Sequence, residues 1–134
     1  MFRDTVLKYY SKEKDLNCAE TILYAANENY NLNLDKNTLK TMAGFGGGMA
    51  VGSTCGAVVG AVAVISIMYT DLRGHQSPKV RQLTEKFYKT FSNKLNYSDC
   101  KRLKDVYFEP SKRCEDIMVM AADVLDELVI MNPK

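Results

Sequence analysis

One uncharged stretch of thirty residues, 41–70, constrains the fold of this chain more than any other feature. It holds seven of the eight glycines, and five of these recur at every fourth position, a spacing that places them along one face of a helix. A glycine costs about 1 kcal/mol relative to alanine in a helix interior. A row of five glycines would therefore be costly unless the missing side chains served a purpose. It predicts that another backbone packs closely against this face, or that the sulfur of a neighbouring cysteine needs the room. The five glycines are Gly44, Gly48, Gly52, Gly56 and Gly60.

An uncharged stretch with glycines four residues apart is also typical of a transmembrane helix. However, three consecutive glycines at 46–48 interrupt it, and the apolar part that follows is rich in Ala, Gly and Ser and poor in Leu and Phe. The rest of the chain has the composition of a soluble protein. We therefore expect a buried core helix over Met49–Tyr69, with Cys55 early in it, and no membrane span.

The length and charge of the chain limit its class. A chain of 134 residues suits one domain, 1–134, and a net charge of +2 from eighteen basic and sixteen acidic residues argues against a nucleic-acid partner. The segment Met1–Asp4 has no apolar run typical of a secretory signal, so we expect a cytoplasmic protein. In a reducing compartment, four cysteines are expected to be thiols, metal ligands or redox groups.

The spacing of apolar residues predicts helices almost throughout, and no segment alternates like a strand. Asn17 and Glu20 have the spacing of a capping box, and Pro78 marks another helix start. We expect an all-α fold, a single-domain helical bundle of about five to six helices with a buried glycine-rich central helix. The expected helices are Phe2–Tyr10, Asn17 to about Tyr30, a short one from Asp35 or Asn37 to Met42, Met49–Tyr69, Pro78–Leu95, and Ser111 to about Met131. Between the last two, Ser98 or Asp99 is expected to cap a short turn that carries Cys100 at its beginning.

The four cysteines all fall at or near predicted helix starts. Unpaired N–H groups and the helix dipole stabilise a thiolate there, most clearly at Cys18 in the first turn after Asn17. If the helix ends meet, one site could contain all four thiols. The cysteines are Cys18, Cys55, Cys100 and Cys114.

The segment Cys55–Gly60 reads CGAVVG and fits a CGAxxG motif. With Cys18 upstream and Cys100 and Cys114 downstream, nearly the whole chain resembles the C_GCAxxG_C_C family of redox-active proteins. The resemblance implies a small helical protein whose four cysteines carry out redox chemistry or hold a metal or iron–sulfur centre. It also implies a functional association with a transporter, because members often appear to be encoded near transport genes.

Three functions remain open from these residues. In the first, Cys18, Cys55, Cys100 and Cys114 are ligands of an iron–sulfur cluster or another soft-metal centre for electron transfer, and Gly56 and Gly60 provide room beside it. In the second, a metal-free oxidoreductase exchanges disulfides with a redox partner protein. Its exchanging thiols are then Cys18/Cys55 and Cys100/Cys114, with Cys18 or Cys55 attacking and Cys100 or Cys114 resolving, and the residues do not select one pair. In the third, the chain is a homodimer packed through its glycines, and the buried cysteines are inert.

Other site chemistries find little support in the sequence. His75 is the single histidine and lies in a polar turn, which disfavours a zinc hydrolase. No lysine follows Gly60 as it would in a phosphate loop, and no strand precedes Gly44 as it would in a dinucleotide-binding turn. We therefore do not expect a nucleotide-dependent enzyme.

Overall fold

The computed structural model describes all 134 residues and contains seven α-helices and no strand. The all-α prediction is confirmed, with seven helices where five to six were expected. The helices are α1 (Phe2–Tyr9), α2 (Cys18–Asn29), α3 (Lys36–Lys40), α4 (Gly56–Tyr69), α5 (Pro78–Leu95), α6 (Cys100–Tyr107) and α7 (Glu115–Met131).

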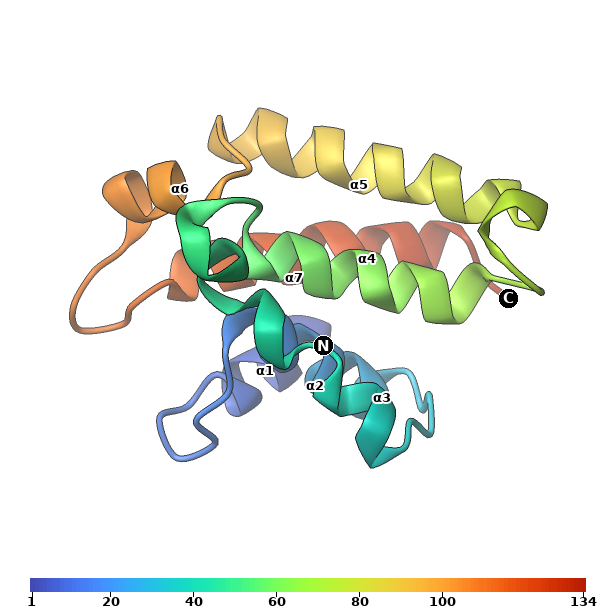
Figure 1. The fold of residues 1–134 in the computed structure, drawn as a ribbon, viewed down its shortest axis with the longest axis horizontal. Helices are drawn as coiled ribbons and strands as arrows, with labels where there is room; N and C mark the ends of the chain where they lie inside the picture. Colours follow the sequence, from blue (N-terminus) through green and yellow to red (C-terminus); the bar gives the residue numbers. More distant parts are fainter.

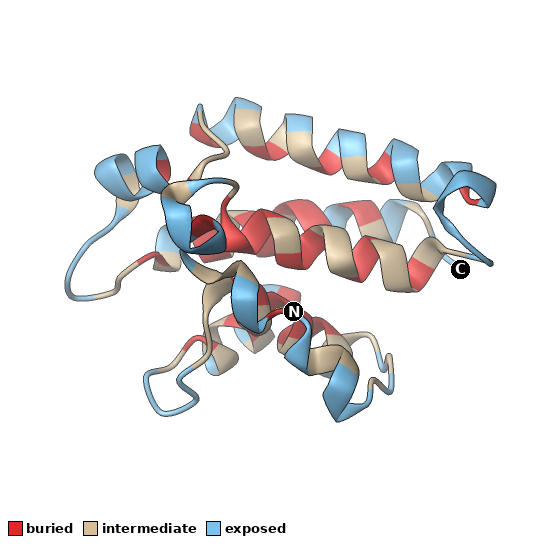
Figure 2. Cartoon of the chain, in the orientation of Figure 1, coloured by how far each residue is buried: buried red, intermediate tan, exposed pale blue.

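Helix α4 lies at the centre of the bundle and packs against α2, α5 and α7. In Figure 1, α4, α5 and α7 run along the long axis, α1 and α2 lie below them, and α6 lies at one end, opposite the C-terminus. The buried residues gather along α4 and α7, and α5 turns its buried residues toward α4 (Figure 2). The expected buried, glycine-rich central helix is therefore present.

Two glycines of α4 allow α2 to approach it closely. A Cβ atom on Gly60 would lie 2.8 Å from the carbonyl oxygen of Ala19 and 2.9 Å from the Cβ of Ile22. A Cβ atom on Gly56 would lie 3.1 Å from the backbone nitrogen of Ala19 and 3.2 Å from the Cβ of Cys18. These glycines therefore serve helix packing, and they bring the start of α2 against the start of α4.

The prediction of a helix over Met49–Tyr69 is wrong in its first part, since α4 begins only at Gly56, and the expected row of five glycines along one helix face is not formed. Gly47, Gly48 and Gly52 have φ values of 63°, 64° and 72°, and Met49 and Ala50 are also left-handed, so this segment cannot continue a right-handed helix. It forms a 3-10 turn, η1 (Ala43–Phe45), and an irregular turn, η2 (Gly48–Gly52). Cys55 consequently occupies the N-cap position of α4.

The start of the last helix was also predicted wrongly. Instead of beginning at Ser111, α7 begins at Glu115, with Cys114 at the N-cap position. Residues 109–113 form a tight turn closed by a backbone bridge between Glu109 and Arg113, and Arg113 has a φ of 55°. This left-handed residue separates the turn from the helix.

The capping box predicted for α2 is confirmed. The Asn17 side chain accepts a hydrogen bond from the Glu20 N–H at 2.8 Å, and the Glu20 carboxylate accepts one from the Asn17 N–H at 2.9 Å. The Asn17 amide also donates to the carbonyl oxygen of Ala43 at 3.1 Å. One side chain thus fixes the start of α2 and ties it to the glycine-rich segment.

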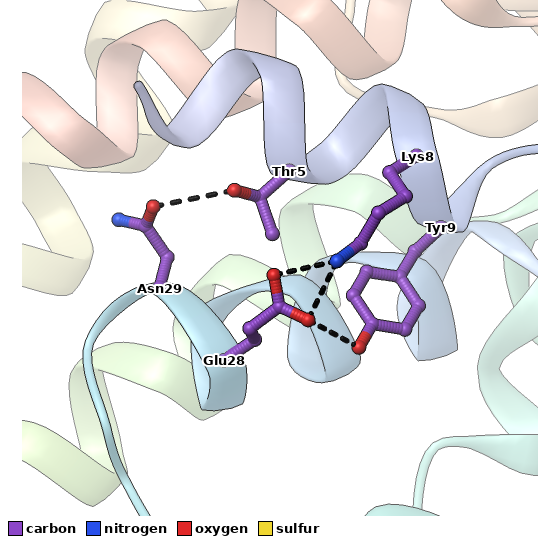
Figure 3. A network of polar contacts seen from close by, with 5 residues as sticks. All are labelled: Thr5, Lys8, Tyr9, Glu28 and Asn29. Atoms are coloured by element: carbon purple, nitrogen blue, oxygen red, sulfur yellow. Dashed lines mark hydrogen bonds and ion pairs between the residues drawn. The ribbon is translucent and has the colours of Figure 1, made fainter.

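Polar contacts fix α1 on its neighbours. Glu28 of α2 accepts from the Lys8 ammonium at 2.7 Å and from the Tyr9 hydroxyl at 2.8 Å (Figure 3). On the other side, the Arg3 guanidinium pairs with the Asp123 carboxylate of α7. Exposed pairs of this kind are worth little individually, but they orient α1 so that Tyr10, at its end, reaches the bundle interior.

The helices of this structure are all too short or too polar to cross a lipid bilayer.

We expect Gly60→Val to lower the free energy of unfolding by about 2–3 kcal/mol, because the new side chain collides with the α2 backbone. Urea unfolding monitored by circular dichroism measures this change. Gly44→Val is the matched control, because a Cβ atom at Gly44 meets nothing within 4 Å, and it should change the stability by less than about 0.5 kcal/mol. Equal effects of the two substitutions would contradict the close α2–α4 contact.

Candidate functional site

A cavity of about 220 Å³ at the α6 end of the bundle is lined by all four cysteines. Their helices begin there: Cys18 and Cys100 are the first residues of α2 and α6, while Cys55 and Cys114 precede α4 and α7. The four predicted site cysteines are therefore brought to one place. The rest of the lining is Tyr10, Leu16, Asn17, Gly47, Gly56, Leu103, Lys104, Phe108, Arg113 and Ile117.

Cys55 and Cys100 are held beside each other by a backbone bridge. The Cys55 N–H donates to the Ser98 carbonyl oxygen at 2.8 Å, and the Cys100 N–H donates to the Ser53 carbonyl oxygen at 2.6 Å. A Cβ atom on Gly48 would lie 2.8 Å from the Cβ of Cys100, so the left-handed glycine leaves room for this cysteine. The irregular turn therefore serves the placement of Cys55 and Cys100.

Cys18 and Cys114 form a second pair. The Cys18 thiol, acting as a hydrogen-bond donor, lowers the pKa of Cys114 to about 6 against the opposing effect of burial. The Lys104 and Arg113 cations and the Tyr10 hydroxyl lower it further. The same hydrogen bond, together with burial, raises the pKa of Cys18. The expected thiolate at Cys18 is therefore not found, and Cys114 is the acidic thiol of the pair.

The other two thiols are poor acids. Burial raises the pKa of Cys55 to about 11, although the N–H groups of Ala57 and Val58 favour its thiolate. Burial likewise raises the pKa of Cys100, and the Lys104 cation only partly opposes this. A helix start therefore does not by itself produce a thiolate here, because the cost of burying the charge is larger.

Tyr10 and Arg113 form one wall of the cavity beside Cys114. The Tyr10 hydroxyl, which is buried, accepts a hydrogen bond from the Cys114 N–H at 3.0 Å. The Arg113 guanidinium lies 4.1 Å from the centre of the Tyr10 ring and donates to the Tyr10 carbonyl oxygen at 2.5 Å. These contacts hold the cation, the phenol and the thiol in fixed relative positions.

The four thiols suit a soft metal by their chemistry, but their placement does not suit a single ion. No three cysteine, histidine, aspartate or glutamate side chains form a group that could hold a metal ion. Of the two glycines predicted to provide room for a centre, Gly56 lines the cavity, whereas Gly60 faces Ala19 and Ile22 of α2. His75 lies outside the cavity, in the 3-10 turn η3 (Gly74–Gln76).

Sequence reasoning missed four residues of the cavity: Tyr10, Lys104, Phe108 and Arg113. Tyr10 follows the short helix α1, and Lys104 resembles any solvated helix lysine. Their role becomes visible only when distant segments meet. The sequence carries one weak signal, since Arg113 directly precedes a cysteine.

The fold and site define a small all-helical protein with one cavity that is lined by four free thiols. The sequence profile of the putative redox-active protein family C_GCAxxG_C_C matches residues 16–128, so the chain belongs to this family. No curated protein and no solved structure matched the chain. Helix α1 and Tyr10 lie before the matched residues.

We expect alkylation of Cys114 by iodoacetamide to be half-maximal at about pH 6, because only the thiolate reacts and the pKa of Cys114 is lowered to about 6. The rate should rise through this pH and be nearly constant above about pH 7. Mass spectrometry of the labelled peptide measures it.

The Cys18→Ala variant removes the thiol that lowers the pKa of Cys114. The midpoint of the pH profile of Cys114 alkylation should therefore move toward 9.0, the ordinary pKa of a cysteine thiol. Preferential labelling of Cys18, or a midpoint near that ordinary value in the unaltered protein, would contradict the assignment.

Proposed function

We propose that the protein is a thiol–disulfide redox protein in which Cys18 and Cys114 form the exchanging pair. The observation that carries the proposal is that Cys18 and Cys114 line one cavity, where the Cys18 thiol lowers the pKa of Cys114. Two thiols that line one cavity can close into a disulfide where their Cα atoms come within about 7 Å. Both also line a cavity that a reaction partner can enter.

The proposed reaction transfers two electrons. The Cys114 thiolate attacks a disulfide of the partner, forming a mixed disulfide and releasing one partner thiolate. Cys18 then loses its proton to the released thiolate and attacks the Cys114 sulfur, so that a Cys18–Cys114 disulfide forms and the second partner thiolate leaves. The partner disulfide is reduced and the dithiol oxidised, and an external dithiol restores the reduced protein by the reverse steps.

The sequence left the pair open, with Cys18 or Cys55 attacking and Cys100 or Cys114 resolving. The proposed pair of Cys18 and Cys114 is one of these combinations, but Cys114 is here the attacking thiol and Cys18 the resolving one. Cys55 and Cys100 have raised pKa values, so they carry little thiolate near neutral pH and are slow nucleophiles. In this proposal they remain reduced and pack the wall behind the reacting pair.

Oxidation with a small disulfide, followed by peptide mapping, tests the pairing. We expect one intramolecular disulfide, between Cys18 and Cys114, in the unaltered protein. Cys114→Ser should lower the exchange rate at least about 100-fold, because the remaining thiols are largely protonated. Cys18→Ser should stop the reaction at the mixed disulfide.

Cys55→Ser and Cys100→Ser are the matched controls, since each removes one thiol of the same cavity. Both variants should still form the Cys18–Cys114 disulfide. A disulfide that joins Cys55 to Cys100, with Cys18 and Cys114 still reduced, would overturn the proposed pair.

A second candidate function is an iron–sulfur centre, and it is favoured by the convergence of four thiols on one cavity. All four cysteines would be its ligands, with Gly56 leaving room beside them. Iron and acid-labile sulfide in protein purified without oxygen, lost in Cys55→Ser, would support this candidate. Metal-free protein with four titratable thiols would leave the exchanging pair as the working site.

A further inference from the structure

We propose that the cavity selects small anionic disulfides, with Lys104 and Arg113 as the residues that attract their carboxylate or sulfonate groups. The inference rests on the proposed exchange at Cys18 and Cys114 and adds the class of substrate. Its basis is the composition of the cavity wall, which contains two cations and no carboxylate.

The charge of the wall is not neutralised by the surrounding residues. On α6, Arg102 is paired with Asp99, and in the following turn Lys112 is paired with Glu109 and Asp116. Neither Lys104 nor Arg113 takes part in any ion pair of the structure. These two unpaired cations leave the mouth of the cavity positive.

The position of the two cations relative to the reacting sulfur is suitable for such a substrate. Arg113 directly precedes Cys114 and is fixed by its contacts with Tyr10. Lys104 lies one turn along α6 from Cys100 and lines the same cavity as Cys100 and Cys114. An anionic group bound between the cations would lie close to Cys114, so the disulfide next to it could be attacked.

The size and the apolar part of the wall limit the substrate further. A volume of about 220 Å³ is smaller than the roughly 300–1,000 Å³ of pockets for drug-sized ligands. Leu103 and Ile117 are buried in the wall, and Phe108, 43% exposed, lies where the cavity reaches the surface. A substrate with a few carbon atoms between its sulfur and its charge fits these features better than a folded protein does.

A small anionic disulfide would react in the same two steps as the partner disulfide described above. With dithiodiglycolate, the Cys114 thiolate attacks one sulfur and releases one thioglycolate. Cys18 then closes the protein disulfide and releases the second thioglycolate. Two electrons pass from the Cys18–Cys114 pair to the substrate. The Cys18 proton passes to the first thioglycolate sulfur, and the second thioglycolate leaves as a thiolate that takes its proton from water, to which Cys114 had released its own.

Three small disulfides that differ chiefly in charge test this inference. They are dithiodiglycolate, which is anionic, bis(2-hydroxyethyl) disulfide, which is neutral, and cystamine, which is cationic. The rate of Cys18–Cys114 oxidation is measured with each, and is divided by the rate of the same disulfide with 2-mercaptoethanol to remove intrinsic reactivity. We expect a preference of about tenfold for the anionic over the neutral compound, and a smaller rate for cystamine. The preference should weaken in high salt.

Lys104→Gln should lower this preference ratio from about tenfold to about threefold, because the charge of Arg113 remains, and Lys104→Arg should retain it. The ratio is the appropriate readout, because loss of the Lys104 charge also alters the reactivity of Cys114 toward every disulfide. Lys101→Gln is the matched control: it removes the same charge from the same helix, but Lys101 does not line the cavity, so the ratio should be unchanged.

Equal normalised rates for the three disulfides would overturn the inference and leave the exchanging pair intact. If none of the three disulfides oxidised the protein, both this inference and the proposed exchange at Cys18 and Cys114 would be overturned. Faster oxidation by a protein disulfide than by dithiodiglycolate would also contradict a small anionic substrate.

Discussion

The close contact between α2 and α4 is the constraint on which the site depends. Gly56 and Gly60 carry no side chain where the backbone of α2 crosses them, and any Cβ atom there would push Ala19 away. Since Cys18 begins α2 and Cys55 directly precedes α4, wider spacing would separate the two thiols. Helix packing and site geometry therefore depend on the same two glycines.

The other half of the site depends on an irregular backbone. Left-handed residues at 47–50 and at Gly52 return the chain toward α6, where the Ser53 carbonyl oxygen accepts a hydrogen bond from the Cys100 N–H at 2.6 Å. Left-handed Met49 and Ala50 are unfavourable by themselves, and backbone strain of this kind is often found at functional sites. Here the strained segment positions Cys100 and closes one side of the cavity.

The helical fold and the capping box at Asn17 could be predicted from the sequence, because they depend on local patterns, and the sequence also singled out the four cysteines that the fold brings to one cavity. It did not predict that α4 begins only at Gly56, because a four-residue glycine spacing fits both a helix and a series of left-handed turns. Nor did it predict the acidity of Cys114, which arises from Cys18, Lys104, Arg113 and Tyr10. Those groups come from distant segments, so only the fold brings them together.

The central claim is that one pair of the four thiols forms the redox couple, and a redox titration of the unaltered protein tests it most directly. The protein is equilibrated in dithiol–disulfide buffers of stepped potential, and its free thiols are alkylated and counted by intact mass. The account predicts a single two-electron transition from four free thiols to two, with Cys55 and Cys100 the two that remain. Four free thiols at every potential, or a transition that consumes Cys55 and Cys100 first, would contradict it.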